Sequence, residues 1–215
     1  QRYNTSYTSV TWETATIRSW LNGYSASSND CGTDYTGKNF LDTAFGSSEQ
    51  RAIKTTAVIN DDSIKYGTNG GNNTNDKIFL LSESEVYTDS ATSYGFDSDY
   101  RESDKARRSK SSTYCKAMGT DSSKSLDYRG NCGWWLRSPG HDANNVASVD
   151  CDGYVYGYGY VVGYGNNYAV RPALHLNLSS SNLYSYAGTV CSDGTVSELN
   201  KPVKKYEILS KYSNS

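Results

Sequence analysis

Tyrosine recurs at every second position from Tyr154 to Tyr160, within a segment between His141 and Tyr168 that reads HDANNVASVDCDGYVYGYGYVVGYGNNY. Successive side chains of an extended strand point to opposite faces, so this spacing places the four tyrosines on one face. Four valines are expected to anchor the same segment to a core: Val146, Val149, Val155 and Val162. The pattern predicts an extended segment that carries a patch of tyrosine.

The sequence before this segment predicts short helices. Apolar residues from Trp12 to Leu21 fall near helical spacing, with Thr11 as a possible N-cap and Gly23 as the C-terminal stop. Ser47 and Gln50 have the spacing of a capping box, which predicts a second helix, and the β-branched run 55–59 after it predicts a strand. A third helix is expected over 103–118, with its Lys and Arg side chains forming a solvated face.

Strand patterns alternate with these helices. The Asn, Gly and Asp-rich stretch 61–76 is expected to be a loop, and 76–82 after it a buried strand. The segment 133–140 predicts another buried strand that ends at a Pro-Gly turn, with at least one of Trp134 and Trp135 in the core. Alternating apolar residues over 168–178 predict a half-buried closing strand.

These elements predict an α+β fold, with short helices packed on small antiparallel sheets and extensive loops. One domain is expected over 1–178, followed by a C-terminal hairpin or tail over 179–215. The net charge of −2 gives no indication of a nucleic-acid partner, and no apolar run suggests membrane insertion. Because the chain begins at Gln1 without a Met, we expect a fragment or a processed product.

The cysteine pattern indicates neither a zinc site nor a redox pair. The five cysteines have spacings that match no known ligand motif, and an odd number leaves at least one thiol unpaired within the chain. Buried or incidental thiols are one interpretation, and one disulfide among Cys31, Cys115, Cys132 and Cys191 is the other. No metal or cofactor is expected.

The composition of the segment 141–168 is typical of a recognition surface. Tyr, Ser, Gly and Asn are favoured in antibody paratopes, because Tyr gives a large contact at low entropy cost and small residues give adaptable hydrogen bonds. The segment contains no Lys, Glu, Gln, Met or Trp, and codons of the form NNY encode none of these five. Such codons arise when the adenines of an Asn codon are randomised. The alternative is a Tyr/Gly-rich strand that only stacks its own rings.

Four fixed segments occur in order around this insert: IRSWLNG, NDKIFLLS, WWLRSPG and AVRPALHLNL. This arrangement, over about Trp12 to Leu178, resembles the variable target proteins of bacterial and phage diversity-generating retroelements. Within that group it resembles the subfamily with a C-type-lectin-like domain, which is related in fold to formylglycine-generating enzymes. The resemblance implies a C-type lectin fold whose final strands present variable residues to a ligand, on a protein that is secreted or displayed on a cell or virion surface.

Carried onto this chain, the resemblance implies a ligand-binding variable face. Its partner would be a protein ligand on another cell or virion surface. The implied positions are His141, Asp142, Asn144, Asn145, Ser148, Asp150, Asp152, Tyr154, Tyr156, Tyr158, Tyr160, Tyr164, Asn166, Asn167 and Tyr168.

Two other functions are less favoured by the sequence. Formylglycine-generating enzymes need a reactive cysteine pair near the last strand, and the corresponding stretch here, 170–174, contains no cysteine. The two histidines, His141 and His175, form no recognisable catalytic constellation, so we expect no enzymatic activity. A carbohydrate-binding, lectin-like module with a fixed aromatic site is the stronger alternative, because tyrosine rings stack on sugars.

Overall fold

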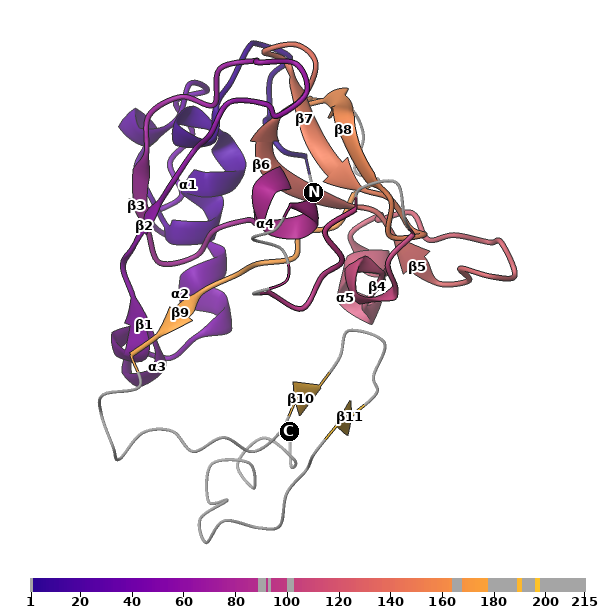
Figure 1. Cartoon of the computed structure of the whole chain (residues 1–215). Helices are drawn as coiled ribbons and strands as arrows, with labels where there is room; N and C mark the ends of the chain where they lie inside the picture. The colour runs from indigo at the N-terminus through magenta and orange to yellow at the C-terminus, as the bar shows by residue number, and fades with distance from the viewer. Residues whose placement is uncertain are drawn as a thin grey trace, which may run out of the picture. The chain divides into compact units, whose positions relative to one another are not determined.

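A computed structural model describes residues 2–88, 92, 94–99, 103–163 and 168–177, together with two short strands at 189–190 and 196–197. The chain divides into two compact units, Gln1–Leu176 and Asn177–Ser215. The first unit mixes short helices with small antiparallel sheets and is therefore of the α+β class (Figure 1). Among the described residues, none of the helices is both long enough and apolar enough to cross a membrane.

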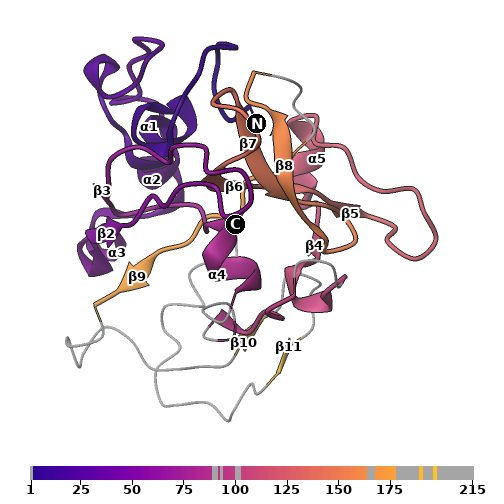
Figure 2. The ribbon, with the colours of Figure 1, turned by 45° about the horizontal axis from the view of Figure 1, so that its top comes forward.

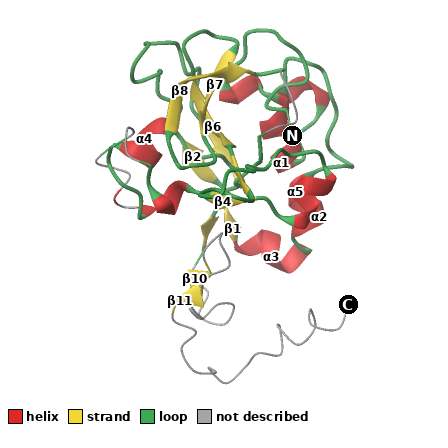
Figure 3. Cartoon of the chain, turned by 90° about the vertical axis from the view of Figure 1, so that its right-hand side faces the viewer, coloured by secondary structure: helices red, strands yellow, loops and turns green. Residues whose placement is uncertain are grey.

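The helices of the first unit are short. The 3-10 helices are η1 (Trp12–Thr14), η2 (Ala26–Ser28) and η4 (Lys105–Arg107). The α-helices are α1 (Thr16–Asn22), α2 (Phe40–Ala44), α3 (Ser47–Ala52), α4 (Glu83–Tyr87) and α5 (Thr113–Ala117). In Figure 3, α4 lies on one side of the largest sheet, and α1, α2 and α5 lie on the other.

The predicted helix ends are confirmed in part. Gly23 adopts the left-handed conformation, with φ of 72°, and ends α1 as expected. Thr11 makes no capping hydrogen bond, and the first turn is the separate helix η1. The capping of α3 begins one residue earlier than the sequence pattern indicates: the Glu49 carboxylate accepts from the backbone N–H of Gly46 at 2.7 Å.

All the named sheets are antiparallel and small. The pairs are β1 (Ile53–Lys54) with β9 (His175–Leu176), β2 (Thr56–Val58) with β3 (Thr74–Asp76), and β4 (Ser109–Lys110) with β5 (Asn131–Cys132). The three-stranded sheet has the order β6 (Trp134–Pro139), β7 (Asn145–Val149), β8 (Val155–Val161). In the second unit, β10 (Thr189–Val190) pairs with β11 (Val196–Ser197).

The three-stranded sheet supplies much of the core and carries the tyrosine segment (Figure 2). Trp134 and Trp135 are both fully buried, which confirms the core assignment of β6. The four valines expected to anchor the segment are also buried. The register of β7 and β8 shifts between Val146 and Ser148, so the outer strand is irregular where the tyrosines lie.

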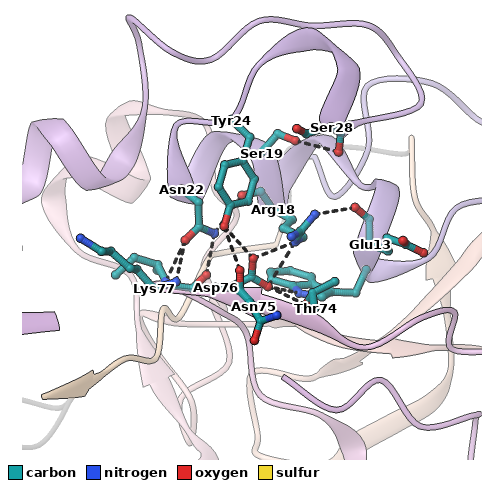
Figure 4. A network of polar contacts seen from close by, with 12 residues as sticks. Glu13, Arg18, Ser19, Asn22, Tyr24, Ser28, Thr74, Asn75, Asp76 and Lys77 are labelled. Carbon is teal, nitrogen blue, oxygen red and sulfur yellow. Dashed lines mark hydrogen bonds and ion pairs between the residues drawn. The ribbon is translucent and has the colours of Figure 1, made fainter. Parts of the chain in front are cut away.

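The predicted strand over 76–82 is buried, but most of it is not paired with another strand. The amide of Asn22 supplies hydrogen bonds in place of a neighbouring strand: its Oδ1 accepts from the backbone of Lys77 and Ile78 at 3.0 and 2.9 Å, and its Nδ2 donates to the Ile78 carbonyl at 2.8 Å (Figure 4). Within the described residues of this stretch, Phe79 makes a single antiparallel bridge, to Ala173. Side-chain hydrogen bonds thus keep this backbone satisfied while it is buried.

The prediction of a third helix over 103–118 is wrong. The segment is divided into η4, β4 and α5, and its Arg107 is fully buried rather than on a solvated face. The guanidinium of Arg107 donates to four backbone carbonyls, those of Val86, Asp97, Asp99 and Gly153. Arg107 therefore holds the loop that follows α4 against the turn that connects β7 and β8.

The closing strand expected over 168–178 is much shorter than its alternating pattern suggests. Only His175 and Leu176 pair as a strand, while Ala169 and Ala173 make single bridges to Trp134 and Phe79. Pro172 has no N–H to donate, which limits continuous pairing here. Leu176 is 42% exposed, and Leu178 lies outside the described residues.

Candidate functional site

The outer strand β8 alternates tyrosine with glycine, and each residue type has a separate structural role. Tyr158 and Tyr160 are 44% and 39% exposed, and Tyr156 is partly buried. Gly157, between two of these tyrosines, faces α4, where a Cβ atom would lie 2.4 Å from Glu83 Oε1. The glycine lets the strand approach the helix closely, while the tyrosines stay on the surface.

Seven aromatic rings form a continuous series of contacts that begins on this surface and ends in the core, and we call this series the aromatic run. Neighbouring ring centroids in the run are between 4.6 and 6.1 Å apart. His141 stacks on Tyr158 with an interplanar angle of 13°, which is the most nearly parallel of these contacts. In spatial order the run is Tyr66, His141, Tyr158, Tyr156, Tyr160, Tyr168 and Trp135.

Tyr66 belongs to this surface although it lies outside the segment 141–168. Its ring meets those of His141 and Tyr158 edge-on, at 5.0 and 5.8 Å. Thr68, two residues later, donates to the carbonyl of His141 at 2.8 Å and fixes the loop against the segment. Nothing in the Asn/Gly-rich sequence around Tyr66 marks this residue, because only the tertiary fold brings the loop to β8.

The positions implied by the sequence do not all lie on the surface. Four are exposed: His141, Asp142, Tyr158 and Tyr160. Six are partly buried: Asn144, Asp150, Asp152, Tyr154, Tyr156 and Tyr168. Three lie outside the described residues: Tyr164, Asn166 and Asn167.

Asn145 and Ser148 are the two positions whose placement departs from a surface role. Asn145 is 7% exposed and Ser148 is fully buried in the middle of the sheet. Ser148 pairs with Trp135 on one side and with Tyr156 on the other, so it lies between two rings of the aromatic run. A residue at this position would influence a ligand through the packing of those rings rather than by direct contact.

Asp150 and Tyr168 join the turn that follows β7 to the last residue of the segment 141–168. The Tyr168 hydroxyl donates to Asp150 Oδ1 at 2.7 Å, and its ring packs against Trp135 at 4.8 Å. Burial raises the pKa of the Asp150 carboxyl, the hydrogen bond from Tyr168 lowers it, and the nearby charge of Asp152 raises it further. Burial also raises the pKa of the Tyr168 hydroxyl, which therefore remains a donor at neutral pH.

A pocket of about 890 Å³ opens beside this end of the aromatic run. Its walls come from two parts of the chain that are distant in sequence. It is lined by residues 121–125, by Tyr128, by 131–133, by 150–152, and by Tyr160 and Tyr168. No sequence pattern predicts the wall at 121–128, which is a polar stretch between α5 and β5. The exposed tyrosine surface and a concave site are thus adjacent.

The cysteines and acidic residues form no metal centre in the described part of the chain, where no group of three or more suitable side chains lies together. The thiols of Cys31, Cys115, Cys132 and Cys151 are free. Cys191 lies outside the described residues, so its part in the expected disulfide alternatives stays a prediction. His175 is exposed and packs edge-on against Phe79 at 5.5 Å.

The comparisons with known proteins give one match. No curated protein and no solved structure matches the chain. The model of one protein family, described as a domain of unknown function (DUF6273), matches residues 1–178, which include every described residue of the aromatic run and of the pocket. The chain therefore belongs to the DUF6273 family.

Proposed function

We propose that the chain is a ligand-binding display protein whose aromatic run is the centre of a diversified recognition surface. The observation that carries this proposal is the continuity of the run, in which exposed tyrosines from β8 are joined by His141 and Tyr66 at the rim. Large rings with polar edges suit a protein surface, and Tyr is enriched among the residues that dominate binding energy. The ligand is accordingly a protein.

The proposal includes the C-type-lectin-like fold and the retroelement origin that the sequence resemblance implies. The α+β class and the buried valines beneath the exposed tyrosines are compatible with this scheme. A scaffold that accepts variation needs a core that does not depend on the varied side chains. Display on a cell or virion, facing a partner on another surface, belongs to the same proposal.

The origin of the segment is tested at the DNA level. The coding locus is sequenced and searched for a near-identical repeat of the region that encodes 134–178, next to a reverse transcriptase gene. We expect the two copies to differ only at adenines of the repeat, and within the codons of the segment 141–168. Absence of a repeat, or differences spread evenly over the region, would remove the diversification part of the proposal.

Binding is tested with a library rather than with a natural ligand. NNY codons replace the codons of His141, Tyr156, Tyr158 and Tyr160, and the library is displayed on yeast and selected on hen egg lysozyme. A control library of the same kind replaces Tyr94 and Tyr114, which are exposed tyrosines outside the segment 141–168 and the aromatic run. Clones that bind lysozyme are expected from the first library alone. Equal yields from the two libraries, or none from the first, would contradict a recognition surface at this site.

A further inference from the structure

The pocket beside the aromatic run is lined mainly by acidic, aromatic and small polar side chains. Three aspartates line it, Asp121, Asp150 and Asp152, against a single cation, Lys124. None of these three carboxylates forms an ion pair within the described residues. The walls also contain three phenol rings, those of Tyr128, Tyr160 and Tyr168. The pocket therefore combines aromatic rings with carboxylates that form no close ion pair, and the buried Arg107 acts on Asp152 from a longer distance.

Asp150 is a partly buried acceptor in this pocket with one carboxylate oxygen that receives no hydrogen bond from the described residues. Within the described chain its side chain receives one hydrogen bond, from Tyr168 to Oδ1, so Oδ2 is open to a ligand. Ser148 lies two residues earlier, on the same side of an extended chain. Its hydroxyl is fully buried and has no hydrogen-bond partner among the described residues. Ser148 does not line the pocket, so it acts on the site through the packing of Trp135 and Tyr156, and Asp150 Oδ2 is the acceptor that the pocket offers.

The protein already places a guanidinium on one of these rings. The Arg108 guanidinium lies 5.0 Å from the centroid of the Tyr128 ring, and its Nε donates to the carbonyl of Asp152 at 2.8 Å. Arginine combines a planar face that stacks on aromatic rings with a fork of donors that matches a carboxylate. An arginine of a ligand that entered the pocket would use the same stacking face and the same fork of donors.

We propose that the pocket receives an arginine side chain of the protein ligand, with Asp150 and Asp152 as acceptors and the exposed ring of Tyr160 as the stacking surface. This inference rests on the proposed function, since it assigns an anchor to the same recognition surface. These residues all lie in the segment 141–168, so the preference for arginine belongs to this copy of the sequence. The wall at 121–128 lies outside the segment, so other copies of the protein would share it. Their pockets would differ in the residues that the segment contributes.

The probe is N-acetyl-L-arginine amide. Its binding to the whole chain is followed by the chemical shifts of the protein's backbone amides in NMR spectra. N-acetyl-L-citrulline amide has the same shape without the charge, and methyl α-glucoside tests the sugar alternative. We expect saturable shifts confined to amides around 121–133 and 150–153 with the arginine probe, and at least about tenfold weaker binding of the citrulline probe. Tighter binding of the glucoside, or shifts spread over the surface, would overturn the inference.

A matched pair of variants separates a specific site from general electrostatic attraction. Asp150→Asn/Asp152→Asn is expected to weaken the arginine probe at least about tenfold. Asp34→Asn/Asp61→Asn changes the net charge equally at two exposed carboxylates outside the pocket and is expected to leave binding unchanged. Equal losses in the two variants would contradict a site at Asp150, as would no loss in either.

The outcomes also separate this inference from the proposed function. In one outcome, the library at His141, Tyr156, Tyr158 and Tyr160 yields lysozyme-binding clones, but the original chain does not bind the arginine probe. This outcome would overturn the arginine pocket and leave the recognition surface in place. Arginine binding without any clones from the library would instead support a fixed small-molecule site and contradict the display function.

Discussion

The indole Nε1 of Trp12 donates to Oδ2 of Asp76 at 2.9 Å, and both side chains are fully buried. The same carboxylate accepts from Arg18 Nε at 2.9 Å and from the Tyr24 hydroxyl at 3.0 Å (Figure 4). Thr74 adds a further donor at 2.7 Å. Asp76 therefore ties η1 and α1 to the end of β3 through charge-assisted hydrogen bonds.

Replacing this carboxylate is expected to destabilise the fold strongly. Asp76→Asn removes the charge that pairs with Arg18. It also places an amide N–H₂ group against side chains that already donate hydrogen bonds. The free energy of unfolding should therefore fall by about 3–5 kcal/mol. Urea unfolding at neutral pH measures the change, with Asp34→Asn as an exposed control. A loss below about 1 kcal/mol, as at an ordinary surface position, would show that the network contributes little.

The sequence predicted best where one local pattern determines one structural outcome. The burial of Trp134 and Trp135, the stop at Gly23 and the anchoring valines each follow from spacing or backbone preference within a few residues. The alternation of β8 also placed Tyr156, Tyr158 and Tyr160 on one face, where their rings contact one another. In each of these places the local signal and the tertiary environment agree.

The errors arise where a distant side chain replaces a local partner. A run of charges around Arg107 has the appearance of a solvated helix, and only the tertiary fold reveals four carbonyls converging on its guanidinium. Asn22 likewise substitutes for a strand beside Ile78. Tyr66 and the pocket wall were missed in the candidate site for the same reason, since residues far apart in sequence carry no signal of their proximity.

The close approach of β8 to α4 leads to a prediction at Gly157. A Cβ at this position would lie 2.4 Å from Glu83 Oε1, so Gly157→Ala should lower the free energy of unfolding by about 1–3 kcal/mol through overpacking. The second substitution Glu83→Ala removes the obstructing carboxylate and is expected to recover part of the loss. Gly37→Ala, where no atom lies within 4 Å of the added Cβ, is the control for denaturant unfolding. A double variant no more stable than Gly157→Ala alone would contradict this contact.

Glu83 itself should make stability depend on pH. Burial raises the pKa of its carboxyl to about 7, although a hydrogen bond from the Ile64 backbone acts in the opposite direction, and Oε2 has no partner among the described residues. The native state holds this proton more tightly than the unfolded chain, so the stabilisation is complete below the unfolded pKa and is lost as pH rises through about 7.

The variant Glu83→Gln isolates this contribution, because an amide does not titrate in this range. We expect the free energy of unfolding of the original chain to fall relative to the variant by up to about 3 kcal/mol between about pH 5 and about pH 8. Urea unfolding of both proteins at the two pH values measures the difference, and Asp61→Asn serves as an exposed control. Parallel pH profiles for the two proteins would show that Glu83 titrates normally.

The last prediction asks whether the exposed tyrosines belong to the surface or to the core. Tyr158 and Tyr160 keep 44% and 39% of their area in solvent, so they bury little that folding needs. Tyr158→Ser/Tyr160→Ser should therefore cost less than about 2 kcal/mol, mostly from lost ring contacts. Trp135→Ala, at the buried end of the same run, should cost about 3–5 kcal/mol.

Urea unfolding measures the loss in free energy of unfolding for Tyr158→Ser/Tyr160→Ser and for Trp135→Ala. The control Tyr7→Ser/Tyr114→Ser replaces two exposed tyrosines outside the aromatic run. The double variant in β8 should resemble this control in stability, because a recognition surface must vary without unfolding its scaffold. If its loss instead approached that of Trp135→Ala, the rings of β8 would be part of the core. A strand whose tyrosines stabilise the fold to that extent could not be diversified, and the recognition surface would have to be given up in favour of a structural strand.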